Sequence, residues 1–255
     1  MKFDVCIDKV FFWRNFIESM ENTKKAGVDD YEFWKWWEKD TDAVLKKQHE
    51  LGMKCITFCT KFITLLDPAQ REAFMQGLAE SIEMAKRFET NMLICQVGYT
   101  LQDVPREHQW SSMVTGIKEC VPLLEKEGFT IIVEPLNHQD HPGYFLTNSR
   151  DAFRLVDEVG SENVKILYDI YHYQINEGNL IKTITDNYGK IAHFHCAGNP
   201  GRGNITRGEI NYPEVFRAIQ SLGYEGYMGL ECGMIDKREE GIADAKRLFE
   251  NSLQA

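Results

Sequence analysis

Four polar side chains that could bind a metal follow short apolar runs in the second half of the chain. Each run is rich in residues that suit a buried strand, and a carboxylate or an imidazole stands at its end. Three carboxylates brought together would repel one another and resist ionising, and a divalent cation removes that cost. Carboxylate oxygens with one imidazole nitrogen suit Mn²⁺ first, with Mg²⁺ or Co²⁺ as alternatives, whereas a structural zinc site would favour thiolates. The predicted ligands are Glu134, Asp169, His195 and Glu231.

A plainer interpretation stands beside the metal site. A single carboxylate at the end of a strand usually means only that the strand has reached water. In "GFTIIVEPLN" the run stops at Glu134, and Pro135 prevents a central strand from continuing. Four such residues at successive strand ends favour one common site. His193 shares a strand face with His195 but lies farther from the strand end, so we expect an interior histidine with a satisfied partner.

These side chains can meet only if the strands that carry them end at one place. The chain contains eight apolar runs, and most are followed by a stretch with the helical spacing of apolar residues. Capping residues precede several of these stretches, and glycines such as Gly128 and Gly160 end them. The expected helices include 71–88, 110–127, 149–159, 212–222 and 236–253. The expected strands are "FDVCI", "YEFW", "MKCITFC", "NMLICQV", "FTIIVE", "VKILYD", "IAHFHCA" and "YMGLEC".

The alternation of strand and helix predicts an α/β fold with parallel strands and helices on the outside. Eight units in 255 residues have the size of a (β/α)₈ TIM barrel. A doubly wound open sheet is the alternative, but its glycine-rich turn is missing after the first strand. No linker or shift in composition divides the chain, so we expect one TIM-barrel domain over residues 1–255. Catalytic residues of such barrels lie at the carboxyl ends of the strands, which places the four predicted ligands at one mouth.

Composition and charge argue against several classes of protein. The formal net charge is −10 and no block of lysine and arginine interrupts it, so a nucleic-acid partner is not expected. No apolar run is long enough for a membrane span, and the acidic N-terminal segment lacks the apolar core of a signal peptide. The seven cysteines contain no CxxC pair, so we expect reduced, buried thiols in a cytoplasmic protein. The expected partner is a small molecule, and a homo-oligomer stays open.

The chain resembles the hydroxypyruvate isomerase family, within the larger group of xylose-isomerase-like barrels. The resemblance extends along essentially the whole chain and is strongest in "IIVEPLNHQDHPGYFLTNS", "YDIYHYQINEGNL", "AGNPGRG" followed by "GEINYPEVF", and "GYEGYMGLE". It implies that the four predicted ligands hold the metal and that Glu134 and Glu231 also move protons. By the same resemblance, His172 and Arg202 orient the substrate.

One residue departs from that family. Hydroxypyruvate isomerases often carry glutamine at the position of the seventh-strand ligand, where this chain has His195. Histidine there resembles the ketose 3-epimerases, such as D-tagatose 3-epimerase, which share the barrel. Asp140 falls where those epimerases carry an acidic substrate contact. The substrate is therefore a compound like hydroxypyruvate or tartronate semialdehyde, or else a ketose.

Isomerisation and 3-epimerisation both remove a proton from the carbon beside a carbonyl. A metal that polarises the carbonyl oxygen makes that proton more acidic and stabilises the enediolate. One carboxylate serves as base, and a second on the opposite side of the substrate returns the proton. Glu134 and Glu231 come from different strands and would approach from different directions. The expected activity is that of a metal-dependent isomerase, with a ketose 3-epimerase as the alternative.

Two rival functions and one cluster of residues stay open. A metal-dependent endonuclease of the same superfamily resembles this chain at strands five to eight, but carries further histidines that are missing here. A non-catalytic sugar-binding barrel would not need two opposed glutamates at a metal. The tryptophans after the second strand could stack on a sugar, make oligomer contacts or simply pack; they are Trp34, Trp36 and Trp37.

Overall fold

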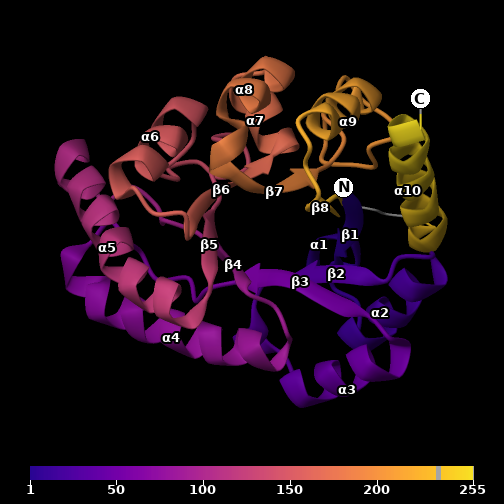
Figure 1. Cartoon of the computed structure of the whole chain (residues 1–255), viewed down its shortest axis with the longest axis horizontal. Coiled ribbons are helices and arrows are strands. Elements are labelled where there is room, and N and C mark those ends of the chain that lie inside the picture. The colour runs from indigo at the N-terminus through magenta and orange to yellow at the C-terminus, as the bar shows by residue number, and fades with distance from the viewer. Residues whose placement is uncertain (234–236, 255) are drawn as a thin grey trace.

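Eight parallel strands close into a barrel in chain order (Figure 1). The computed structural model describes residues 1–233 and 237–254. The strands are β1 (Lys2–Cys6), β2 (Asp30–Phe33), β3 (Lys54–Cys59), β4 (Met92–Cys95), β5 (Thr130–Val133), β6 (Val164–Asp169), β7 (Ile191–Cys196) and β8 (Tyr227–Leu230). Each strand pairs with the next, and β8 closes the ring against β1. The predicted (β/α)₈ barrel and all eight predicted strands are therefore confirmed.

Helices surround the ring of strands on its outside (Figure 1). The α-helices are α1 (Ile7–Val10), α2 (Phe16–Lys25), α3 (Thr41–Leu51), α4 (Arg71–Arg87), α5 (Arg106–Glu127), α6 (Ser149–Val159), α7 (Ile170–Asn176), α8 (Leu180–Asn187), α9 (Tyr212–Ser221) and α10 (Arg238–Gln254). The 3₁₀ helices are η1 (Trp36–Glu38), η2 (Pro68–Gln70) and η3 (Tyr188–Lys190). The predicted helix 236–253 is observed as α10, and its predicted start at Asp236 lies outside the described residues. None of the described helices is both long and apolar enough to cross a membrane.

The local sequence explains helix boundaries, as α6 shows. The Asn148 side chain accepts a hydrogen bond from the backbone N–H of Asp151 at 2.8 Å, which satisfies one of the free donors at the helix start. Gly160 ends the helix with φ of 72°, a conformation that glycine adopts without steric cost. Between these caps, Phe153 and Val156 are buried on the face toward the strands. The predicted range 149–159 is the observed one.

The main apolar core lies between the strands and the helices, and a second, smaller cluster lies inside the barrel. That inner cluster comes from four neighbouring strands, β3 to β6, and consists of Cys59, Ile94, Ile132 and Leu167. All seven cysteines of the chain are unpaired and buried, as predicted. The apolar cluster fills only one side of the barrel interior.

The other side of the interior is polar. Its buried side chains come from β1, β2 and β7, and are Asp4, Glu32, His193 and His195. β8 contributes Gly229 at this level, where a Cβ would lie only 2.8 Å from Asp4 Oδ1 and from Glu32 Oε1. The glycine therefore makes room for a polar layer directly beneath one end of the barrel.

Candidate active site

The four predicted ligands lie together at the carboxyl ends of β5 to β8. All four are at most 5% exposed, so their charges are largely removed from water. Carboxylate oxygens of Glu134, Asp169 and Glu231 lie within 4.8 Å of one another. His195 Nδ1 lies 3.2 Å from Glu231 Oε2 and 3.7 Å from Glu134 Oε1. Buried like charges this close need a compensating cation.

Asp169 is fixed by the helix that follows it. As the N-cap of α7, it accepts hydrogen bonds on Oδ1 from the backbone N–H groups of Tyr171 at 2.8 Å and His172 at 3.3 Å. Its Oδ2 instead lies 3.4 Å from Nη2 of Arg202, a residue that lines the cavity. Burial raises the pKa of Asp169 although the Arg202 guanidinium opposes this. One oxygen of Asp169 thus holds the backbone and the other is available to a ligand.

Glu231 is held from two sides. The Trp34 indole donates a hydrogen bond to its Oε1 at 2.8 Å, and the Arg202 guanidinium pairs with its Oε2. Burial alone would raise the pKa of Glu231, but Arg202 and His195 outweigh it and hold the pKa well below its ordinary value. The carboxylate is therefore ionised and oriented, and its charge is available to a cation.

Two histidines approach the carboxylates, and hydrogen bonding distinguishes their roles. By distance alone, His172 joins Glu134, Asp169 and Glu231 as a possible ligand. However, His172 Nδ1 accepts a hydrogen bond from the backbone N–H of Asn137 at 3.1 Å. Burial, with the nearby Arg202, lowers the pKa of His172 well below its ordinary value, so the ring is neutral. A neutral ring that accepts at Nδ1 carries its proton on Nε2. Nε2 is then a donor toward the cavity and not a metal ligand.

In His195 it is the nitrogen without a proton that faces the carboxylates. Its Nε2 lies 2.8 Å from Glu32 Oε1, and an ionised carboxylate can only accept, so the proton belongs on Nε2. The lone pair of a neutral ring is then on Nδ1, the atom that faces Glu134 and Glu231. Burial alone would lower the pKa of His195, but Glu32 and Glu231 hold it well above its ordinary value. A divalent cation between the carboxylates would replace that extra proton.

These observations fit a divalent cation. Three buried carboxylates surround a space that His195 Nδ1 also faces, 3.2 Å from Glu231 Oε2. The donor set of three carboxylates and one imidazole suits Mn²⁺, Mg²⁺ or Co²⁺. Glu134, Asp169, His195 and Glu231 would hold it, as the sequence predicts.

Glu32 is the functional residue that sequence reasoning missed. It accepts a hydrogen bond from His193 Nε2 at 3.0 Å and contacts His195 with its other oxygen, and all three residues are buried. The prediction that His193 is an interior histidine with a partner is thus confirmed. A signal was present: in "YEFW" the alternation of side chains puts Glu32 on the face opposite Tyr31 and Phe33. A carboxylate there must point into the barrel.

The loop between β7 and α9 brings Arg202 to the carboxylates. Gly198 and Gly203 exchange backbone hydrogen bonds of 2.7 and 3.1 Å across its neck. Arg202 has φ of 52°, and its carbonyl accepts a hydrogen bond from the N–H of Gly233 at 2.6 Å. The loop therefore presents the guanidinium to the cavity from a fixed backbone.

Asp140, the predicted acidic substrate contact, also lines the cavity. Its Oδ2 accepts hydrogen bonds from the Tyr171 hydroxyl at 2.8 Å and the Asn137 side chain at 3.0 Å. Hydrogen bonds to the ionised form help to lower the pKa of Asp140, against the effect of its partial burial. The carboxylate thus orders the loop after β5 and leaves Oδ1 for a ligand.

The cavity over these residues has a volume of about 880 Å³, within the usual range for small-molecule sites. Among the three tryptophans after β2, Trp34 lines it. Trp36 donates a hydrogen bond to Ser81 on α4 at 3.2 Å, and Trp37 packs edge-on against Phe62. Only Trp34 of the three is therefore placed to touch a substrate.

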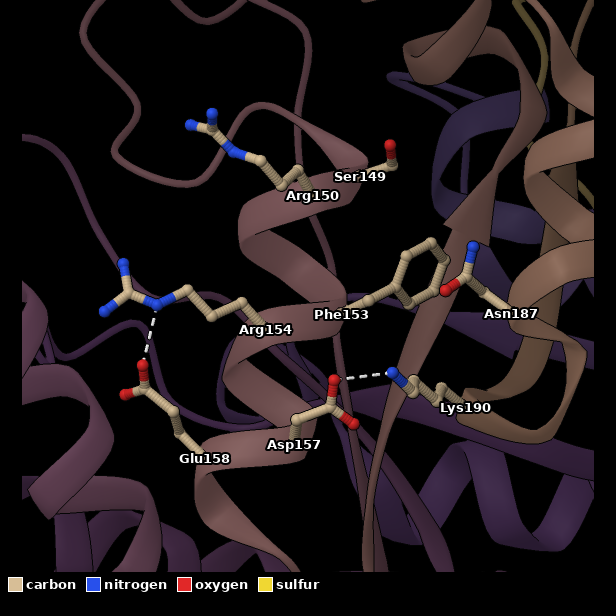
Figure 2. Close-up of a pocket in the computed structure, with 8 residues that line it drawn as sticks. All are labelled: Ser149, Arg150, Phe153, Arg154, Asp157, Glu158, Asn187 and Lys190. Carbon is tan, nitrogen blue, oxygen red and sulfur yellow. Dashed lines mark hydrogen bonds and ion pairs between the residues drawn. The ribbon is translucent and has the colours of Figure 1, made fainter.

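A second cavity, of about 460 Å³, lies outside the barrel between α6 and the end of α8 (Figure 2). Four of its charged side chains pair with one another, Lys190 with Asp157 and Arg154 with Glu158, both at 2.6 Å (Figure 2). The fifth, Arg150, pairs with Asp151 at 3.2 Å. These pairs satisfy the charges, so the cavity is a contact between helices rather than a candidate active site.

Known proteins resemble this chain in sequence. A model of the xylose isomerase-like TIM barrel family matches residues 20–252. The hydroxypyruvate isomerase of Escherichia coli (strain K12) is 32% identical over 261 aligned residues, which cover 95% of this chain and 97% of that protein. The 2-oxo-tetronate isomerase of Cupriavidus necator is 32% identical over 162 residues, or 63% of this chain and 62% of that protein.

Solved structures share the fold. An AP endonuclease, family 2, from Brucella melitensis superimposes with a TM-score of 0.91 at 25% identity and covers 97% of this chain and 99% of its own. A D-psicose 3-epimerase from Clostridium cellulolyticum H10, solved with D-tagatose, gives a TM-score of 0.85 at 16% identity with 99% of both chains covered. The latter likeness shows the fold alone.

The sequence relatives confirm the predicted enzyme class, an isomerase related to the hydroxypyruvate isomerases. With its closed barrel and a family model that matches most of its length, the chain belongs to the xylose isomerase-like TIM barrel family.

Proposed function

We propose that the protein is a metal-dependent isomerase of a small hydroxy-carbonyl compound such as hydroxypyruvate. The observation that carries the proposal is the convergence of three buried carboxylates and His195 Nδ1 on one cavity. The similarity to a hydroxypyruvate isomerase over nearly the full length of both proteins supports the substrate class. A divalent cation in this cluster, Mn²⁺ by preference, would polarise the substrate carbonyl and stabilise the charge of the enediolate.

Two glutamates would move the proton. Glu134 follows β5 and Glu231 follows β8, so they reach the cavity from strands that are three apart in the ring. One glutamate, ionised, takes the proton from the hydroxyl-bearing carbon of hydroxypyruvate, and the other, which starts the step protonated, gives its proton to the former carbonyl carbon. Proton exchange with solvent then returns both side chains to their starting states. A hydroxyl proton passes between the two oxygens, so the product is the isomeric aldehyde, tartronate semialdehyde. The charges balance and no redox cofactor is needed.

His172 and Arg202 would orient the substrate. The Nε2–H of His172 is buried, lacks a hydrogen-bond acceptor among the described residues and points toward the carboxylates. A substrate oxygen in the cavity would accept this hydrogen bond. Arg202 already contacts Glu231 and Asp169, so it can neutralise an oxyanion that forms beside them.

A ketose 3-epimerase is the second candidate. The presence of histidine at position 195 and a cavity of about 880 Å³, roomy enough for a sugar, favour it. An endonuclease has less support, because the ends of β3 and β4 present Phe62, Thr64 and Gln96 to the cavity instead of zinc ligands.

Deuterium uptake from D₂O separates these candidates. The protein with Mn²⁺ is incubated with hydroxypyruvate or with small ketoses, and substrate and product are analysed by NMR. We expect metal-dependent exchange and conversion of hydroxypyruvate. Exchange at C3 of a ketose with formation of its epimer would favour the second candidate. A fully metal-loaded protein that exchanges no proton in any of these compounds would contradict both.

A further inference from the structure

Lys9 is a cation of the cavity wall that the proposed chemistry does not use. It lies in α1, the single turn that follows β1, and lines the cavity together with Arg202 and Glu231. The side chain is partly buried, and it makes no side-chain hydrogen bond or ion pair within residues 1–233 and 237–254. Its ammonium nitrogen is not among the fully buried polar atoms, so it is open to the cavity and to a ligand bound there.

The other lysines near this mouth are already paired. Lys35 forms an ion pair of 2.8 Å with Glu38 and lies over the Phe62 ring, while Lys39 pairs with Asp8 at 2.8 Å. Lys9 differs from both because no carboxylate pairs with it, although Glu231 and Asp140 are near enough to act on its charge along with Arg202. Burial lowers the pKa of Lys9, and the Arg202 guanidinium lowers it further. An anion bound between Lys9 and Arg202 would relieve both effects.

The negative charge of the site is a second reason to expect a cation that binds the substrate. The chain has a formal net charge of −10, and Glu134, Asp169 and Glu231 surround the reacting position. An anionic substrate would be repelled unless local cations face its charged end. A neutral ketose offers only hydroxyl groups there and leaves the ammonium without a counter-charge.

We propose that Lys9 binds the carboxylate of a 2-oxo acid substrate and so selects this anionic class over neutral ketoses. The inference rests on the proposed function, because it assigns one end of the substrate of that same site. The reacting carbons then lie between Glu134 and Glu231, and the carboxylate lies toward β1. Lys9 acts on specificity and takes no part in the proton transfer.

The test compares Lys9→Met with Lys35→Met, a change of the same type at the same mouth, at a lysine that already has a partner. The substrates are hydroxypyruvate and dihydroxyacetone, in which a hydroxymethyl group replaces the carboxylate. Loss of a charged hydrogen bond is expected to lower kcat/KM of Lys9→Met for hydroxypyruvate roughly 10- to 100-fold, mostly through KM. Deuterium exchange into dihydroxyacetone is expected to stay within about threefold, Lys9→Arg to recover much of the loss, and Lys35→Met to resemble the parent.

The other outcomes separate a failure of the role of Lys9 from a failure of the proposed function. Parental kcat/KM of Lys9→Met for hydroxypyruvate, or an equal loss on both substrates, would overturn the role of Lys9 while the proposed function stands. If the parent turns over neither compound, the proposed function fails. Calorimetric titration of hydroxypyruvate into the Mn²⁺-loaded parent and Lys9→Met proteins still tests the site, and equal affinities would overturn it. Should Lys9→Met fail to fold, as seen by circular dichroism, Lys9→Gln takes its place.

Discussion

The two halves of the barrel carry different side chains at the same mouth. The ends of β5 to β8 bring the oxygen and nitrogen atoms that suit a divalent cation: Glu134, Asp169, His195 and Glu231. The segments after β1 to β4 line the same cavity with two cations and several aromatic rings: Lys9, Trp34, Lys35, Phe62 and Tyr99. In the proposed function, the second half would therefore supply the reactive groups, and the first half would supply groups that recognise the shape and charge of the substrate.

Side chains of the first half also contact the predicted ligands of the second half. Glu32 on β2 contacts both histidines of β7, and Trp34 donates its hydrogen bond to Glu231 after β8. Ligands from one half are thus oriented by residues from the other. The geometry of the predicted ligands therefore depends on side chains of β2 and of the residue that follows it.

The largest effect is expected from the paired glutamates. Glu134→Gln and Glu231→Gln each keep the shape and one oxygen donor but remove the proton acceptor. Loss of a general base typically lowers the rate by about 10²–10⁴, so each variant should lose most solvent exchange of the substrate proton. Each should still bind Mn²⁺, measured by metal analysis after dialysis.

Glu225→Gln, at an exposed turn before β8, is the matched control and should behave as the parent. If either site variant keeps parental turnover at saturating Mn²⁺, that glutamate is a ligand only and the two-base mechanism is wrong.

A smaller effect is expected from Glu32→Gln in the first half. An amide has one accepting oxygen, so it cannot accept from both His193 and His195, and its NH₂ group would face one of the rings. The lone pair on His195 Nδ1 is then no longer enforced. Changes to such supporting residues typically cost about 10- to 100-fold in metal affinity, measurable by titration with Mn²⁺. An unchanged Mn²⁺ affinity would show that the two halves are independent, and Glu38→Gln on η1 is the control.

The smallest effect is expected at the outer cavity of Figure 2. Lys190→Met removes a surface ion pair with Asp157. Surface substitutions usually change stability by no more than about 0.5 kcal/mol, so the denaturation midpoint and the activity should both stay close to those of the parent. A clear loss of activity with unchanged stability would give this cavity a function that its paired charges do not suggest.

The sequence predicted the fold well because its signals are local. Apolar runs and amphipathic stretches alternate along the chain, and caps such as Asn148 and Gly160 bound the helices where expected. The short elements α1 and α7 were not predicted. A helix of one or two turns has too few residues to show a period, and it forms because the adjoining strand ends fix its position.

The pattern of strands predicted the candidate site only at strand ends, and the family resemblance added His172, Arg202 and Asp140, which line the cavity. Glu134, Asp169 and Glu231 stand at such positions, whereas Glu32 lies within a strand and its partner His193 is 161 residues away. The sequence and the resemblance chose His195 over His172 as ligand, but the physical reason for that choice lies in tertiary contacts, those of Asn137 with His172 and of Glu32 with His195. Contacts between residues that are far apart in the chain produce no periodic pattern in a single sequence.

The most direct test of the account is a crystal structure of the protein grown with Mn²⁺, with the ion located by its anomalous signal. The account predicts one ion bound by Glu134, Asp169, Glu231 and Nδ1 of His195, with Nε2 of His172 free to donate to a substrate oxygen. An ion held by His172 in place of His195 would contradict it, as would carboxylates that remain paired with Arg202 and bind no ion.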